Sequence, residues 1–154
     1  MIAVSNIQEG INLRQHNIKS QILILEPIEV KDMLNCYYYH LTPTISSLHQ
    51  FNKLCKAKFF ASLPIHLKID SGMHRLGVNK EETIIIKEKL NIYSNLKLTG
   101  IFTHLIGNEK QEGFIANQIK YFEEIIDIFN DYSLCIHMAS SSSLDIDNIK
   151  TNAT

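Results

Sequence analysis

Charged side chains gather at one turn of the sequence, where a strand-like segment runs into glycines. That segment reads His66-Leu67-Lys68-Ile69-Asp70-Ser71-Gly72-Met73-His74-Arg75-Leu76-Gly77-Val78. Up to Asp70 apolar residues alternate with polar ones, as in a β-strand. Lys68, Asp70 and Arg75 follow closely, and such charges pack together only if they neutralise one another or bind an anion. Because ligands bind at the carboxyl ends of parallel strands, the spacing leaves two interpretations open: an anion site, or a solvated strand end with a flexible loop.

The same segment resembles the fifth-strand signature of bacterial alanine racemases, Lys-x-Asp-[Ser/Thr]-Gly-Met-x-Arg-x-Gly. Every fixed position of that pattern is met between Lys68 and Gly77. The resemblance implies a pyridoxal 5′-phosphate cofactor, alanine as substrate and an N-terminal (β/α)8 barrel. It further implies that Arg75 donates to the phenolic oxygen of the cofactor and that Lys68 is carbamylated, so that its negative charge neutralises the guanidinium. The alternative for Lys68 is a lysine whose ammonium reaches solvent from the top of the barrel.

Two further phrases extend the resemblance. Residues 100–105 read Gly-Ile-Phe-Thr-His-Leu, similar to the family's Gly-Ile-x-Thr-His-Phe, which implies that His104 lies beside the pyridine ring. Residues 137–141 read His-Met-Ala-Ser-Ser, similar to the family's His-x-Ala-Asn-Ser, which implies that Ser141 binds the cofactor phosphate. Ser140 stands where the family has Asn, so two amide donors are lost. Catalytic roles are therefore expected for Arg75, Lys68 and His104, and cofactor contacts for Arg75, His104 and Ser141.

Strand-like runs alternate with helix-period segments along the whole chain, which predicts βαβ units and a parallel sheet. We expect strands over residues 2–4, 21–25, 37–41, 64–70, 98–105 and 134–139, and helices over 7–14, 29–34, 46–56, 81–90 and 117–130. From the residues alone, an open doubly wound sheet and an incomplete barrel fit equally well. The resemblance favours a partial (β/α)8 TIM barrel with about six parallel strands, equivalents of strands two to seven. It covers residues 1–145 as one domain, and residues 146–154 are expected to form a frayed C-terminal tail.

Composition excludes several classes of protein. Among 154 residues, 45% are hydrophobic and 20% charged, which is typical of a soluble globular domain rather than a disordered chain. Fifteen basic residues balance sixteen acidic ones, so the net charge of −1 predicts neither nucleic acid nor membrane as a partner. Cys36, Cys55 and Cys135 are widely spaced, which indicates reduced thiols in a cytoplasmic protein and no metal site.

Several phrases of the family are absent from this sequence. They are the Lys-Ala-Asn-Ala-Tyr-Gly phrase of the first strand, whose lysine binds the cofactor covalently, the Val-Arg-Pro-Gly phrase of the eighth strand, and the C-terminal domain. In the homodimeric family that domain lends a catalytic Tyr to the partner subunit. We therefore expect a fragment of a peptidoglycan-supplying alanine racemase that is inactive alone. Two alternatives stay open: another barrel protein with this cofactor (a broad amino-acid racemase or a cofactor-homeostasis protein), or a non-functional gene remnant. Reading the flanking DNA would separate a split or mis-started gene from a decayed one.

Overall fold

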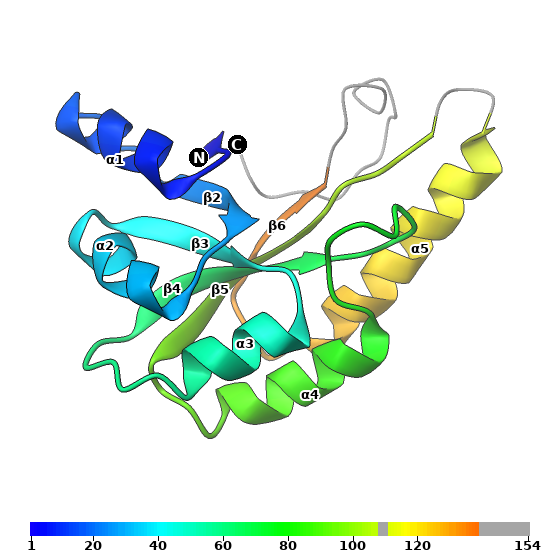
Figure 1. Cartoon of the computed structure of the whole chain (residues 1–154). Helices are drawn as coiled ribbons and strands as arrows, with labels where there is room; N and C mark the ends of the chain where they lie inside the picture. The colour runs from blue at the N-terminus through cyan, green and yellow to red at the C-terminus, as the bar shows by residue number, and fades with distance from the viewer. Residues whose placement is uncertain (108–110, 139–154) are drawn as a thin grey trace.

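The computed structural model describes residues 1–107 and 111–138. Its six strands are all parallel and lie in the order of the sequence. They are β1 (Ile2–Val4), β2 (Ile22–Pro27), β3 (Leu41–Ile45), β4 (Leu63–Ile69), β5 (Leu96–Thr103) and β6 (Cys135–Met138). The sheet curls into a half-barrel (Figure 1), which confirms the expected partial TIM barrel.

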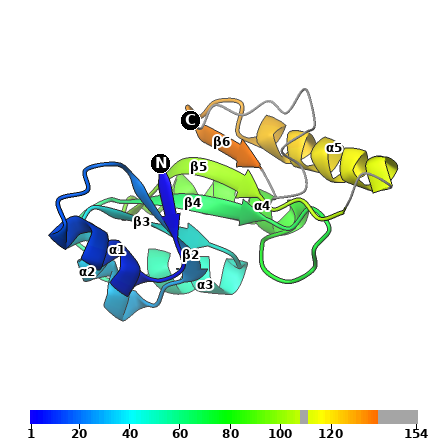
Figure 2. The ribbon, with the colours of Figure 1, turned by 90° about the horizontal axis from the view of Figure 1, so that it is seen from above.

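Helices connect successive strands and cover the convex face of the sheet (Figure 2). They are α1 (Ile7–Gln15), the short 3-10 helix η1 (Val30–Asp32), α2 (Met33–Tyr38), α3 (Leu48–Cys55), α4 (Lys80–Leu90) and α5 (Glu112–Ile128). The side chains of Asn6, Ser47 and Asn79 begin α1, α3 and α4 by accepting from free backbone N–H groups. No described helix is long and apolar enough to cross a membrane.

Alternation along β4 divides its side chains between two environments. Ile65, Leu67 and Ile69 are buried among the helices in the hydrophobic core. His66 and Lys68 lie on the opposite, concave face, which is the interior side of a barrel. His66 is nevertheless fully buried, so the polar face of this strand does not face water.

The predicted strand over residues 37–41 is wrong. Tyr37 and Tyr38 end helix α2, and the strand begins only at Leu41. Tyrosine favours strands, but that preference reflects packing more than backbone conformation. Here the ring of Tyr37 packs edge-on against Phe59 and Phe60 from the loop before β4, and tertiary packing overrides the local preference.

The third strand runs past residue 41, its expected end, and includes a proline. Pro43 lies within β3 and pairs with Ile24 of β2. The ladder between the two strands shifts register between Ile24 and Pro27. Because proline has no N–H to donate, prolines are expected where ladder pairing is irregular.

Arg14 joins two loops at the amino-terminal end of the sheet. Its guanidinium donates to the carbonyl oxygens of Ile18 (2.6 Å) and Ser20 (2.8 Å) in the loop before β2. It also donates to those of Tyr39 and His40 in the loop before β3, both at 2.9 Å. One side chain thereby satisfies four carbonyls that no helix or strand would otherwise pair.

Candidate functional site

The loop after β4 is closed into a ring by backbone and carboxylate hydrogen bonds. Oδ1 of Asp70 accepts from the amides of Gly72 (3.1 Å) and His74 (2.9 Å). The amide of Asp70 donates to the carbonyl of Val78 at 3.1 Å, which brings the chain back to its starting point. Gly77 has φ 141°, and an added Cβ would lie 2.5 Å from the Asp70 nitrogen, so only glycine fits there. The tip of the loop, which carries Arg75, is thus held at its base.

Lys68 lies on the concave face near the end of β4 and is partly buried. It pairs in register with Phe102 of β5, and its Nζ lies 6.0 Å from the centre of that ring. Desolvation lowers the pKa of Lys68 first, and the charge of Arg75 lowers it further, while Asp70 opposes both. The uncharged amine is therefore a larger fraction of Lys68 than of an ordinary lysine.

His104 and Arg75 share this end of the half-barrel with Lys68. Arg75 is exposed in the loop after β4. His104 is the first residue after β5, which ends at Thr103, two residues earlier than expected. Burial lowers the pKa of His104, and the charges of Lys68 and Arg75 lower it further. The structure therefore brings Lys68, Arg75 and His104 together at the carboxyl ends of two neighbouring strands.

The two cations at this end are not neutralised by a neighbouring carboxylate. Among the side chains described in residues 1–107, 111 and 113–138, no Asp or Glu forms an ion pair within 4.0 Å of Lys68 or Arg75. Asp70 is the nearest candidate by sequence, but its Oδ1 accepts from the loop amides and its Oδ2 lies 3.8 Å from Nδ1 of His74. Neutralisation by an ion pair is therefore not seen among the described side chains, and the geometry suits an anionic ligand.

A second group of side chains on the concave face was missed from the sequence. Nδ1 of His66 and Nε2 of His137 are 3.1 Å apart, and the ring of His137 stacks on Phe102 at 4.8 Å and 7°. Burial lowers the pKa of both histidines to about 4, with His137 a further cause for His66. Among the described residues, Nε2 of His66 and Oγ1 of Thr44 are buried without a hydrogen-bond partner, and Thr44 of β3 pairs in register with His66 of β4. Their signal in the sequence was the period-2 placement of polar residues in otherwise apolar strands.

Gln118 of α5 holds the chain just after His104. Its side chain accepts from the amide of Ile106 at 3.1 Å and donates to the carbonyl of Ile106 at 2.7 Å. The hydroxyls of Ser71 and Thr103, 2.7 Å apart, tie the Arg75 loop to the end of β5. Together these contacts fix the loop after β4 relative to the chain that follows β5. The spacing of residues in the sequence did not predict this role.

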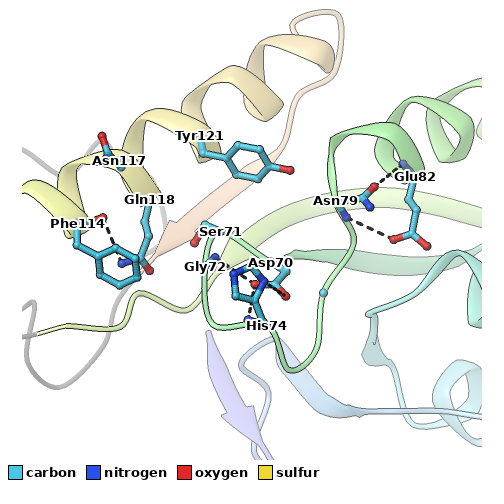
Figure 3. A pocket seen from close by; sticks show the side chains of 11 residues that line it. Asp70, Ser71, Gly72, His74, Asn79, Glu82, Phe114, Asn117, Gln118 and Tyr121 are labelled. Atoms are coloured by element: carbon cyan, nitrogen blue, oxygen red, sulfur yellow. Dashed lines mark hydrogen bonds and ion pairs between the residues drawn. The ribbon is translucent and has the colours of Figure 1, made fainter.

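The cavity in Figure 3 lies between α5 and the outer side of the loop that follows β4. It has a volume of about 620 Å³, and Asp70, Glu82 and Tyr121 are among its lining residues. A second cavity of about 500 Å³ includes Arg75. The first contains neither Lys68 nor His104, so it does not coincide with the candidate site. No group of three or more possible metal ligands occurs among the residues with defined positions.

Ser141, the expected phosphate ligand, lies outside the described residues, as does the expected tail at 146–154. Its role stays a prediction.

Comparison with known proteins gives a consistent result over nearly the whole chain. The family model "Alanine racemase, N-terminal domain" matches residues 1–150. Alanine racemase 1 of Bacillus subtilis (strain 168) is 32% identical over 144 residues, which cover 92% of this chain and 37% of that protein. The alanine racemase of Halothermothrix orenii is 28% identical over 146 residues, 92% of this chain and 38% of that protein.

Among solved structures, the alanine racemase of Clostridium difficile 630 superposes with a TM-score of 0.86 at 27% identity. The match covers 97% of this chain and 41% of that one. The chain thus spans about two fifths of the length of the relatives it matches. The resemblance expected from the signature at Lys68–Gly77 is confirmed.

Proposed function

This chain belongs to the alanine racemase N-terminal domain family, and from that premise we propose that it binds pyridoxal 5′-phosphate for the racemisation of alanine. One observation supports this most. Lys68 and Arg75 lie at the carboxyl ends of the strands with no carboxylate ion pair in the described part of the chain. With no such ion pair in the described residues, the guanidinium of Arg75 can donate to a hydrogen-bond-accepting cofactor. When bound, the cofactor supplies an electron-withdrawing ring that stabilises negative charge after an amino acid loses its α-proton.

Arg75 and His104 have distinct roles in this proposal. Arg75 donates to the phenolic oxygen of the cofactor from a loop whose base is held by the Asp70 hydrogen bonds. His104 lies beside the ring. Because burial, Lys68 and Arg75 all lower its pKa, it is a neutral donor rather than a third cation at pH 7. Ser141 is proposed to bind the phosphate because residues 137–141 resemble the family's His-x-Ala-Asn-Ser and a hydroxyl can donate to a dianion.

Lys68 is proposed to carry a carbamate. The uncharged amine attacks carbon dioxide, a nitrogen–carbon bond forms, and one proton leaves the nitrogen for solvent. Desolvation and Arg75 favour the uncharged amine that this reaction needs. The product is an anion, so it removes the repulsion between Lys68 and Arg75 and orients the guanidinium.

The groups that move protons are not among the residues of this chain that match the family. Racemisation needs one acid–base group on each face of the substrate. In the family these are a first-strand lysine and a tyrosine of the partner subunit. We propose that this chain supplies cofactor contacts but turns over alanine only where both groups are provided, in the cytoplasm and within a homodimeric assembly that makes D-alanine for peptidoglycan.

An absorption titration with pyridoxal phosphate tests the binding site. Arg75→Ala is expected to weaken binding about 10-fold to 100-fold, since hydrogen bonds to charged groups contribute about 1.5–3 kcal/mol. Lys120→Ala, which removes an exposed cation on α5, is the matched control and should bind as the parent chain does. Equal binding by Arg75→Ala and the parent chain would contradict the proposal.

Carbamylation is tested separately. With ¹³C-labelled bicarbonate, a carbamate carbon signal should appear and should be lost in Lys68→Arg. Borohydride trapping of the cofactor should yield no stoichiometric lysine adduct, and an adduct on Lys68 would overturn the carbamate role.

A further inference from the structure

An aromatic patch protrudes at the amino-terminal end of the half-barrel. Its rings in mutual contact are Tyr37 from the end of α2 and Phe59 and Phe60 from the loop before β4, and the exposed Tyr38 follows Tyr37 in the chain. The ring of Tyr37 lies 5.9 Å from Phe59 and 5.6 Å from Phe60, in both cases edge-on. Tyr38 is 72% exposed and Phe60 is 79% exposed. Phe60 has no polar atom in its side chain, so this exposure carries the full cost of hydrating an aromatic ring.

The patch lies in a basic part of the chain. From Met33 to Ile69 the sequence contains no Asp and no Glu, although the chain as a whole has sixteen acidic residues. Lys56 and Lys58 flank Phe59 and Phe60 in the same loop, and both are exposed. Neither lysine forms an ion pair with any residue whose position is described. The balanced net charge therefore conceals a local surface that combines exposed rings with unpaired cations.

The position of the patch leaves the candidate site free. The loop at 56–62 leads into the first residue of β4, whereas Lys68 and Arg75 lie at the other end of that strand. In Figure 1 this loop and α2 lie together on one side of the sheet, away from the loop that follows β4. A partner bound at the patch would not cover the carboxyl ends of the strands.

We propose that the aromatic patch, with Lys56 and Lys58, docks the protein peripherally on an anionic phospholipid bilayer. Aromatic rings partition into the interfacial region, and lysines place their ammonium groups among anionic headgroups. Single-stranded nucleic acid fits less well, because it stacks on rings spaced along a groove. Here Tyr37, Phe59 and Phe60 contact one another and form one apolar cluster. The expectation that a membrane is not a partner rested on the net charge of the whole chain, which averages out this local basic surface.

Vesicle flotation of the full chain tests this docking, since aggregates sediment whereas lipid-bound protein rises. The probes are vesicles of phosphatidylcholine with phosphatidylserine, and vesicles of phosphatidylcholine alone. Flotation is expected with the anionic vesicles, less with the neutral ones, and less again as salt is raised. Lys56→Glu with Lys58→Glu should lower the partition coefficient at least about 20-fold, since each lysine contributes about fivefold.

The contribution of the aromatic rings is tested with the double variant Tyr38→Ser and Phe60→Ser, which should abolish flotation. The matched controls are Ile84→Ser, which removes a 44% exposed apolar residue from α4, and Lys120→Glu on α5. Both should float as the parent chain does. Circular dichroism of every variant establishes that the fold is retained, which the high exposure of Tyr38 and Phe60 favours.

Three results would overturn the proposal. They are no flotation of the parent chain, equal flotation with both vesicle types that the lysine variants do not reduce, and binding of polyuridylate that depends on the same residues while vesicles are ignored. None of them bears on cofactor binding, which the Arg75→Ala titration tests at the opposite end of the sheet.

Discussion

The imidazole of His66 lies over Gly100 and reaches His137 on a strand that is not its neighbour. Nδ1 of His66 is 3.1 Å from Nε2 of His137, and one ring donates while the other accepts. Gly100 of β5 stands between them, in register with His66 on one side and Cys135 on the other. The missing side chain of Gly100 leaves the space through which β4 and β6 make contact.

Substitution of Gly100 by alanine should therefore destabilise the fold. The added Cβ would lie 2.5 Å from Cε1 and Nε2 of His66, closer than packed atoms allow. Overpacking of this kind costs about 1–3 kcal/mol, measured as the free energy of unfolding in urea. Gly113→Ala is the control, because a Cβ at Gly113 meets nothing within 4 Å and should stabilise α5 by up to about 1 kcal/mol. Equal effects of the two substitutions would mean that His66 moves aside freely.

The buried histidines should make the protein less stable in mild acid. Burial lowers the pKa of His66 and His137 to about 4 from 6.5, so the unfolded chain binds protons first as the pH falls. Their contribution to stability is present above pH 6.5 and is lost as the pH falls toward 4. The loss is up to about 1.4 kcal/mol per pH unit for each imidazole. Urea unfolding at several pH values measures it. His137→Phe should reduce the slope, and an unchanged slope in this variant would contradict the burial argument.

The same two histidines show which features the sequence could predict. Alternation along residues 65–69 predicted a strand, and Ile65, Leu67 and Ile69 are indeed buried against the helices. The burial of His66 could not be predicted in this way, because it depends on the curl of the sheet and on Gly100, which is 34 residues away. Similarly, the signature predicted Lys68 and Arg75 as neighbours in the site, but the occupation of Asp70 by loop amides comes from local backbone geometry. Sequence motifs therefore predicted which residues form the candidate site, whereas contacts between residues distant in the sequence determine how those residues are buried and bonded.

Loss of Gln118 should loosen the chain after His104. Gln118 is 2% exposed and bonds both backbone groups of Ile106. Gln118→Ala leaves these groups unpaired in a partly buried place, which should cost about 1–3 kcal/mol and speed hydrogen exchange at the Ile106 amide. Asn117→Ala removes the neighbouring, exposed amide of α5 and should change neither quantity. Unaltered exchange at Ile106 in Gln118→Ala would show that the loop is held by other contacts.

The chain alone should not racemise alanine, even with excess cofactor. Each missing acid–base group contributes about 10²–10⁴-fold, so the loss of both brings the rate to background. D-Alanine formation is followed with a coupled oxidase, and the alanine racemase of Bacillus subtilis serves as the positive control. Turnover that depends on the cofactor and disappears in Arg75→Ala would contradict this expectation.

The two ends of the sheet should make the isolated chain associate. Within the described residues, β1 and β6 are the edges of the sheet. The amide of Ile2 donates to the carbonyl of Gln21 inside the sheet, so the amide of the next residue, Ala3, faces away from β2. Exposed strand edges pair with other chains unless a charge or a bulge prevents it.

We therefore expect concentration-dependent association in size-exclusion chromatography. Ala3→Lys places a charge on the β1 edge and should shift the chain toward monomer, whereas Ala116→Lys adds the same charge on the exposed face of α5 and should not. A parent chain that elutes as a monomer and unfolds in one sharp transition would show that the open edges are tolerated, and that six strands suffice for a stable half-barrel.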